Sequence, residues 1–180
     1  MRFREYFLCG AVGFSAMVSS SQAKEVEFDH TKLDLAKLIE CRATVPEYSR
    51  LGAWLKMEPQ ALEKLGWQQA DSGNPFIEQY RLDKPVAVFA TQTRDVAFAG
   101  YGLLAVLDHD AEHDLARELD VPTLFDQSGR FERVIAEGTD DSNALIAVKT
   151  RVSLQISTFE SHPGKIFAGC SYSFSLEVQE

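Results

Sequence analysis

Two histidines and a glutamate near the middle of the chain, His109, Glu112 and His113, form the clearest chemical cluster. His and Glu side chains are usual zinc ligands in proteins. His109 and His113 are four residues apart, so on a helix they would project from the same face. A catalytic zinc site needs a third protein ligand, and no residue supplies it by its spacing. Acidic residues that could complete the site follow later in the chain: Glu132, Glu137 and Asp140.

The stretch from His109 to His113 resembles the His-x-x-Glu-His motif of inverted zinc peptidases. In that family the two histidines bind zinc and the glutamate activates water, so the resemblance implies a metal-dependent hydrolase that uses His109, Glu112 and His113. It covers five of 180 residues. Several aspartates flank the same stretch, and acidic residues near a helix N-terminus stabilise the helix in any protein. We therefore keep the hydrolase as an alternative hypothesis and assign no catalytic, cofactor or metal residue.

The N-terminus has the pattern of a secretory signal peptide. Arg2 and Arg4 precede an uncharged run from Tyr6 to Ser20. This run ends at Ser21-Gln22-Ala23, a small-x-small cleavage site, and it is shorter than the roughly 20 apolar residues of a spanning helix. The sequence predicts removal of residues 1–23 on export to the periplasm, with full secretion as the alternative, and no membrane span in the mature protein.

Two cysteines, Cys41 and Cys170, would remain in the mature chain, because Cys9 lies within the signal peptide. An even pair in an oxidising compartment is most simply a disulfide. A thiol nucleophile or a metal site is the alternative, but the sequence has no Cys-x-x-Cys and no His adjacent to either cysteine. We therefore predict a Cys41–Cys170 disulfide that ties an early helix to the last strand.

The whole chain is acidic, with 27 Asp and Glu against 18 Lys and Arg and a net charge of −9. Nucleic acids and anionic membranes are bound through cationic contacts, so this charge argues against both as partners and is compatible with a cationic one. Acidity also keeps an exported protein soluble without any partner, and that alternative stays open.

Helical patterns come first in the mature chain, and strand patterns follow. The predicted helices cover residues 31–41, 44–55, 59–65 and 110–119. The predicted strands cover residues 76–82, 85–91, 95–107, 131–136, 144–157 and 165–179. Residues 24–180 therefore form a single α+β domain with a largely antiparallel sheet and helices packed on one face, in the order helices, three strands, helix, three strands.

The last two predicted strands form a long antiparallel hairpin with one apolar and one polar face. The apolar positions of its second strand, expected in a core, are Cys170, Tyr172, Phe174, Leu176 and Val178. The polar face is rich in serine, and it is either solvated sheet or a docking surface. A resemblance between Asp34-Leu35-Ala36-Lys37 and Asp114-Leu115-Ala116-Arg117 raises the question of a weak internal duplication.

These observations favour an exported, non-enzymatic binding protein for another protein or an envelope component. A specific form is an inhibitor or immunity protein against a cationic cell-wall hydrolase, because complementary charge accelerates association and sharpens partner choice. The alternatives are the metal-dependent hydrolase with His109, Glu112 and His113, and a structural or assembly factor of the envelope. The sequence does not set the oligomeric state.

Overall fold

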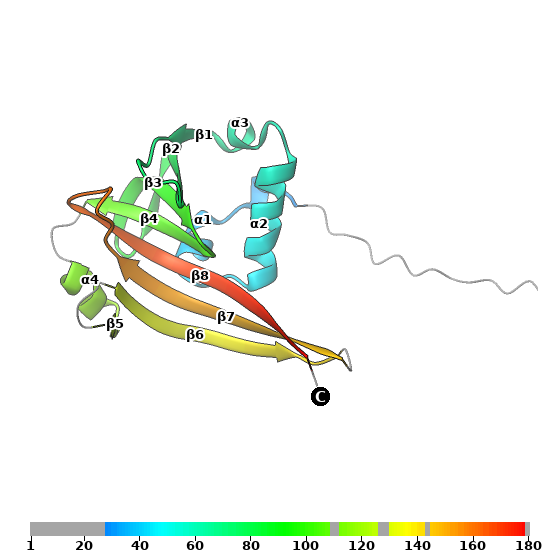
Figure 1. The fold of residues 1–180 in the computed structure, drawn as a ribbon. Helices are drawn as coiled ribbons and strands as arrows, with labels where there is room; N and C mark the ends of the chain where they lie inside the picture. The colour runs from blue at the N-terminus through cyan, green and yellow to red at the C-terminus, as the bar shows by residue number, and fades with distance from the viewer. Residues whose placement is uncertain (1–27, 109–111, 126–129, 143–144, 179–180) are drawn as a thin grey trace, which may run out of the picture.

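The computed structural model is an eight-stranded antiparallel sheet with helices packed on one face (Figure 1). It describes residues 28–108, 112–125, 130–142 and 145–178. The helical elements are η1 (His30–Lys32), α1 (Leu35–Ile39), α2 (Val45–Met57), α3 (Ala61–Leu65) and α4 (Glu112–Glu118). The strands are β1 (Trp67–Ala70), β2 (Ile77–Val88), β3 (Thr91–Ala99), β4 (Gly102–Asp108), β5 (Thr123–Phe125), β6 (Arg130–Asp140), β7 (Ile146–Ser157) and β8 (Lys165–Val178).

The sheet consists of two four-stranded meanders that meet at its centre. The strand order is β1-β2-β3-β4-β8-β7-β6-β5. Each meander therefore runs from one edge of the sheet to its centre, where the last strands of the two meanders, β4 and β8, pair. α1, α2 and α4 contribute buried side chains to the same main core. The predicted class, α+β with a largely antiparallel sheet and helices on one face, is confirmed.

The first α-helix before the first meander, α1, and the helix before the second meander, α4, end in the same way. Each ends on a backbone hydrogen bond to the carbonyl five residues back, Arg42 to Lys37 at 2.9 Å and Val121 to Ala116 at 2.7 Å. The residue before each donor has positive φ, as a Schellman end requires: Cys41 at 58° and Asp120 at 54°. The acceptors Lys37 and Ala116 are 79 positions apart, whereas the resemblance between residues 34–37 and 114–117 pairs residues that are 80 positions apart. An alignment of the two helix ends therefore differs by one residue from the alignment of the two similar sequences.

Each meander has four strands where the sequence predicts three. β1 and β5 are short edge strands without an alternating pattern. β2 runs through Asp83-Lys84-Pro85, which the sequence predicts as a turn, and its register with β3 shifts between Arg81 and Val86. Pro85 lies within this irregularity, where its missing N–H interrupts no ladder bond.

The predicted strand 95–107 is two strands that are folded back on each other. Ala99 pairs with Gly102, and Gly100 between them has a φ of 57°. Glycine adopts this left-handed conformation without steric cost, so the chain reverses there. Residues 96–99 and 103–107 are apolar on both faces, so the sequence leaves Gly100-Tyr101-Gly102 open as a bulge or a tight turn, and the tight turn forms.

The predicted helix ends are partly confirmed. Thr44 and Glu47 form the predicted capping box of α2, and Gly66 ends α3 in the left-handed conformation. The predicted helix 31–41 is instead η1 followed by α1, because the Asp34 side chain accepts from Lys37 N–H and caps a new helix. Asp110, the predicted start of the fourth helix, lies outside the described residues.

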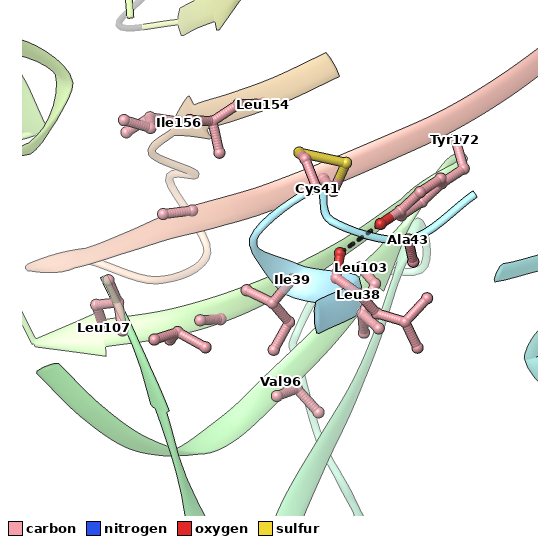
Figure 2. Close-up of a cluster of buried hydrophobic side chains, with 14 of the residues drawn as sticks. Leu38, Ile39, Cys41, Ala43, Val96, Leu103, Leu107, Leu154, Ile156 and Tyr172 are labelled. Atoms are coloured by element: carbon pink, nitrogen blue, oxygen red, sulfur yellow. Dashed lines mark hydrogen bonds between the residues drawn. A yellow bond between two sulfur atoms is a disulfide. The ribbon is translucent and has the colours of Figure 1, made fainter. Parts of the chain in front are cut away.

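The main core lies between the helices and the centre of the sheet (Figure 2). Its largest fully buried side chains include Ile39, Leu51, Leu103, Ile156 and Tyr172. Cys41 and Cys170 lie at disulfide-bonding distance with their Cα atoms 5.1 Å apart, and Figure 2 draws their sulfurs bonded across this core. The predicted pairing thus joins the end of α1 to the middle of β8.

The opposite face of the sheet is covered at its centre by the loop between β7 and β8. Phe159 packs edge-on against Phe167, with ring centroids 4.8 Å apart. A second apolar cluster gathers beneath this loop: Ile77, Ala97, Leu104, Val106 and Phe167. The centre of the sheet is therefore buried on both faces.

The distal parts of β6, β7 and β8 extend beyond the helices as a three-stranded arm (Figure 1). We use the name "arm" for residues 134–140, 146–151 and 173–178. Phe174, Leu176 and Val178, expected in the core, are 51%, 63% and 80% exposed there. That expectation is wrong because β4 starts opposite Ser171, so the covered part of the sheet ends near Tyr172.

Candidate functional site

A groove lined by aromatic side chains lies between α2 and the adjoining strands. Its volume is about 470 Å³. The aromatic lining residues are Tyr48, Phe76, Tyr80, Phe98, Tyr101 and Phe174. Glu78 and Lys56 also line it. A concave surface with several aromatic side chains and a few charged groups has the composition of a ligand site.

α2 forms one wall of the groove through residues four positions apart. Tyr48, Gly52 and Lys56 lie on the same helix face. A Cβ atom at Gly52 would meet nothing within 4 Å, so the helix surface there borders open space. The small residue keeps the groove open between the ring of Tyr48 and the ammonium group of Lys56.

The strands supply the rest of the wall, and the core holds their rings in place. The Tyr48 ring stacks on buried Tyr172, with centroids 4.9 Å apart. Tyr80 meets Phe98 edge to face at 5.9 Å, and Trp67 packs behind Tyr80 at 5.7 Å. Offset and edge-to-face contacts of this kind fix ring orientation. These aromatic surfaces are therefore positioned before any ligand binds.

Glu78 places a carboxylate among these rings. Tyr80 donates its hydroxyl hydrogen to Glu78 Oε2 at 3.3 Å. Within the described part of the chain, Glu78 has no ion-pair partner within 4 Å. Burial, and then the Glu78 charge, raises the pKa of Tyr48 to about 12. The same two causes and the hydrogen bond to Glu78 raise the pKa of Tyr80. Both phenols therefore stay protonated at neutral pH.

An unpaired carboxylate beside aromatic faces favours a cation. Cations are attracted to the faces of tyrosine rings and to carboxylates, most strongly where water is partly excluded. Lys56 at the other side of the groove would repel a second positive charge and would attract a carbonyl or carboxylate. The arrangement fits one lysine or arginine side chain on a segment that carries no second positive charge.

The predicted zinc cluster stays an untested prediction. His109 lies outside the described residues, and the side chains of Glu112 and His113 on α4 are not described. Two of the acids that could complete the site, Glu132 and Glu137, instead contact Arg151 at 3.2 and 3.6 Å. In the described ranges, no three His, Cys, Asp or Glu residues lie close enough to hold a metal ion.

A second polar cluster joins the loop 158–164 to the sheet. The Ser161 hydroxyl lies 2.8 Å from His162 Nδ1, and His162 Nε2 lies 2.8 Å from Gln79 Oε1. A serine–histidine pair of this kind activates a nucleophile when a carboxylate stabilises the imidazolium, and the neutral Gln79 amide cannot do so. Burial and the nearby Lys165 charge lower the pKa of His162. We interpret these contacts as the attachment of the loop.

His162 lies beside Pro163 in a turn, where a solvent-exposed side chain is the usual expectation. Its ring instead packs edge-on against Phe167 at 4.9 Å and is half-buried. The serine-rich face of the hairpin, the other suggested docking surface, is crossed by ion pairs such as Lys149–Glu177 at 2.7 Å. It lacks the aromatic side chains that the groove provides.

The groove cannot be recognised from the sequence pattern. Tyr48 falls in the apolar stripe of the predicted helix 44–55, and Glu78 is one polar residue in a strand pattern. The two residues are 30 positions apart, and only the packing of α2 against the sheet brings them together. The only signal for the groove in the sequence is the strand alternation, which places Glu78 and Tyr80 on the same face of the sheet.

Comparisons of the chain with family models, curated proteins and solved structures find no match. Among the described residues, no helix is both long and apolar enough to cross a membrane.

Proposed function

We propose that this is an exported, non-enzymatic binding protein that holds a cationic segment of another protein in the aromatic groove. The observation that carries the proposal is the carboxylate of Glu78, which lies without an ion-pair partner among the rings of the groove. Export to the periplasm rests on the N-terminal pattern, which lies outside the described residues. A cationic cell-wall hydrolase, inhibited by this contact, is the specific partner class.

Two features of the molecule support this partner class. The net charge of −9 attracts a cationic protein over long range and accelerates its association. The groove supplies rigid aromatic surfaces, and tyrosine and arginine dominate the energetic centres of protein interfaces. The charge of the whole chain and the anchor in the groove then act on the same cationic partner.

The first experiment measures binding to a cationic muramidase and to arginine-containing decapeptides by calorimetry. Glu78→Gln removes the groove charge, and we expect it to weaken binding about 3- to 5-fold, since Glu78 is exposed and an exposed charged pair contributes up to about 1 kcal/mol. Glu160→Gln is the matched control, because it removes the same charge from an exposed loop. It should change affinity less than about 2-fold.

Salt and enzyme assays complete the test. Binding should weaken as salt rises, because both the steering and the ion pair are screened. Muramidase activity on peptidoglycan should fall when the protein is added. Equal effects of Glu78→Gln and Glu160→Gln would show that the groove is not the contact. Failure to bind any of these cationic probes would contradict the proposal as a whole.

A further inference from the structure

The arm has an unpaired backbone edge along β8. The ladder between β4 and β8 ends at Gly102 and Ser171, and the last contact is from Tyr172 N–H to Tyr101 O at 2.9 Å. Since backbone groups alternate sides along a strand, the N–H and C=O groups of Phe174, Leu176 and Val178 point to the same side as those of Tyr172. No strand of the described chain pairs with them there.

The side chains beside this edge are apolar. Ile146 lies opposite Val178 in the β7–β8 ladder, and it is 38% exposed. We use the name "apolar strip" for these two residues together with Phe174 and Leu176, which share their face. The exposed parts of the four side chains amount to roughly 450 Å², about half of the roughly 800 Å² that each partner contributes to a standard interface.

The other edge of the arm, on β6, has the features that protect an edge strand. β5 pairs only with the first two residues of β6, so the rest of this edge is also open. Its register with β7 shifts between Val134 and Ala136, a bulge that distorts the edge. Charged residues follow along it: Arg133, Glu137 and Asp140. The edge of β8 has neither a bulge nor a charge before Glu177, which is the composition of a strand that pairs.

We propose that two copies of the protein pair antiparallel along this edge of β8, about a twofold axis at Ser175. This register places Phe174 opposite Leu176 of the second copy and uses the open edge from Ser173 to Glu177, because Val178 would face Tyr172, whose N–H is bonded to Tyr101 O. The N–H and C=O groups of Phe174 and Leu176 point toward the second copy, so each Phe174–Leu176 pair is a hydrogen-bonded pair. Glu177 faces Ser173, and no like charges are opposed. The two apolar strips become continuous across the axis.

The pairing can be measured by sedimentation of the disulfide-bonded protein. We expect a species of twice the chain mass at about 10–100 μM, in the range of a moderate-affinity homodimer. Rising salt should strengthen it, because two copies of charge −9 repel each other and salt screens the repulsion. Cationic ligands of the groove should show the opposite salt dependence, so failure of this inference and failure of the proposed function are distinguishable.

Leu176→Lys and Val134→Lys form a matched pair of variants. Both replace an exposed apolar residue of the arm by lysine, on the β8 edge and on the β6 edge respectively. We expect Leu176→Lys to raise the dimer dissociation constant at least 10-fold and Val134→Lys to leave it unchanged. A monomeric wild type, or a dimer that Leu176→Lys leaves intact, would overturn the proposal.

A cysteine crosslink tests the register. Residues opposed in a non-hydrogen-bonded antiparallel pair have Cα atoms about 4.5 Å apart, within the range of a disulfide. Ser175→Cys should therefore form a covalent dimer under mild oxidation while Ser173→Cys, which faces Glu177, should not. Crosslinking of Ser173→Cys in preference to Ser175→Cys would exclude the twofold axis at Ser175.

Discussion

Tyr172 connects the core, the groove and the first helix through one side chain. Its hydroxyl donates to Leu38 O at 2.7 Å (Figure 2). Its ring stacks on that of Tyr48. Leu38 lies in the last turn of α1, where carbonyl groups have no partner within the helix. Burial raises the pKa of Tyr172, while the nearby Ala43 backbone acts in the opposite direction. The residue therefore acts as a buried hydrogen-bond donor that completes a helix end.

Tyr172→Phe should lower the free energy of unfolding by about 1–2 kcal/mol, because the Leu38 carbonyl would stay buried without a partner. Urea unfolding followed by fluorescence measures the change. Tyr101→Phe is the control, since Tyr101 is 57% exposed, and it should change stability by less than about 0.5 kcal/mol. Equal stability of the Tyr172→Phe variant and the wild type would show that the hydrogen bond contributes nothing net.

Among the secondary-structure elements, α2 has the best-defined start and forms one wall of the groove. The Glu47 side chain accepts from Thr44 N–H at 2.8 Å and from Lys37 Nζ at 2.6 Å. The hydrogen bond from Lys37, and then that from the Thr44 backbone, lowers the pKa of Glu47 to about 2. One carboxylate therefore caps α2 and ties it to α1.

This pKa gives the stability a defined acid dependence. Since the pKa of Glu47 is lower in the folded state than its ordinary value of 4.5, its contribution is complete above pH 4.5 and is lost as the pH falls toward 2. About a third of both side chains is exposed, so solvent screening limits the contribution to about 1 kcal/mol.

Glu47→Gln should reduce stability by about 1 kcal/mol at neutral pH and flatten the acid dependence between pH 4.5 and 2, because the amide cannot ionise. Thermal unfolding at a series of pH values measures both effects. Glu118→Gln, on the exposed surface of α4, should leave the shape of the curve unchanged. If Glu47→Gln retains the full acid dependence, other carboxylates are responsible for it.

At the scale of the whole molecule, the Cys41–Cys170 pair joins the end of α1 to the last strand, β8. The two residues are 129 positions apart, and Cys170 is fully buried. A link across a loop of this length restricts the unfolded chain strongly. It also holds α1 against β8, next to the Tyr172 contact that supports the groove.

Reduction of this pair should destabilise the protein by about 5 kcal/mol, as chain-entropy arguments give for a loop of this length. The Cys41→Ala, Cys170→Ala double variant should be destabilised comparably, with a further cost for the lost buried sulfur atoms. Chemical unfolding with and without dithiothreitol measures both. The double variant should not respond to dithiothreitol. A loss below about 1 kcal/mol on reduction would contradict a major role for the pair.

The residue types and their local spacing determined the class of the fold. Alternation in the last 40 residues predicted the β7–β8 hairpin, and the capping box at Thr44 and Glu47 predicted the start of α2. These features depend on neighbouring residues, so they can be found without tertiary information. The sequence also marks 83–85 and 100–102 as turn-like, but a bulge and a tight turn use the same residue types, so it could not decide that β2 runs through the first and that the chain reverses at the second.

Only the tertiary structure decided which apolar residues are buried and where a site forms. Tyr172 and Phe174 have the same place in one alternating pattern, yet the helices cover only Tyr172. Glu78 and Tyr48 line the same groove because α2 packs against the sheet at β7 and β8. Burial and the convergence of side chains depend on contacts between distant parts of the chain, whereas local periodicity specifies only which face of its own element a residue occupies.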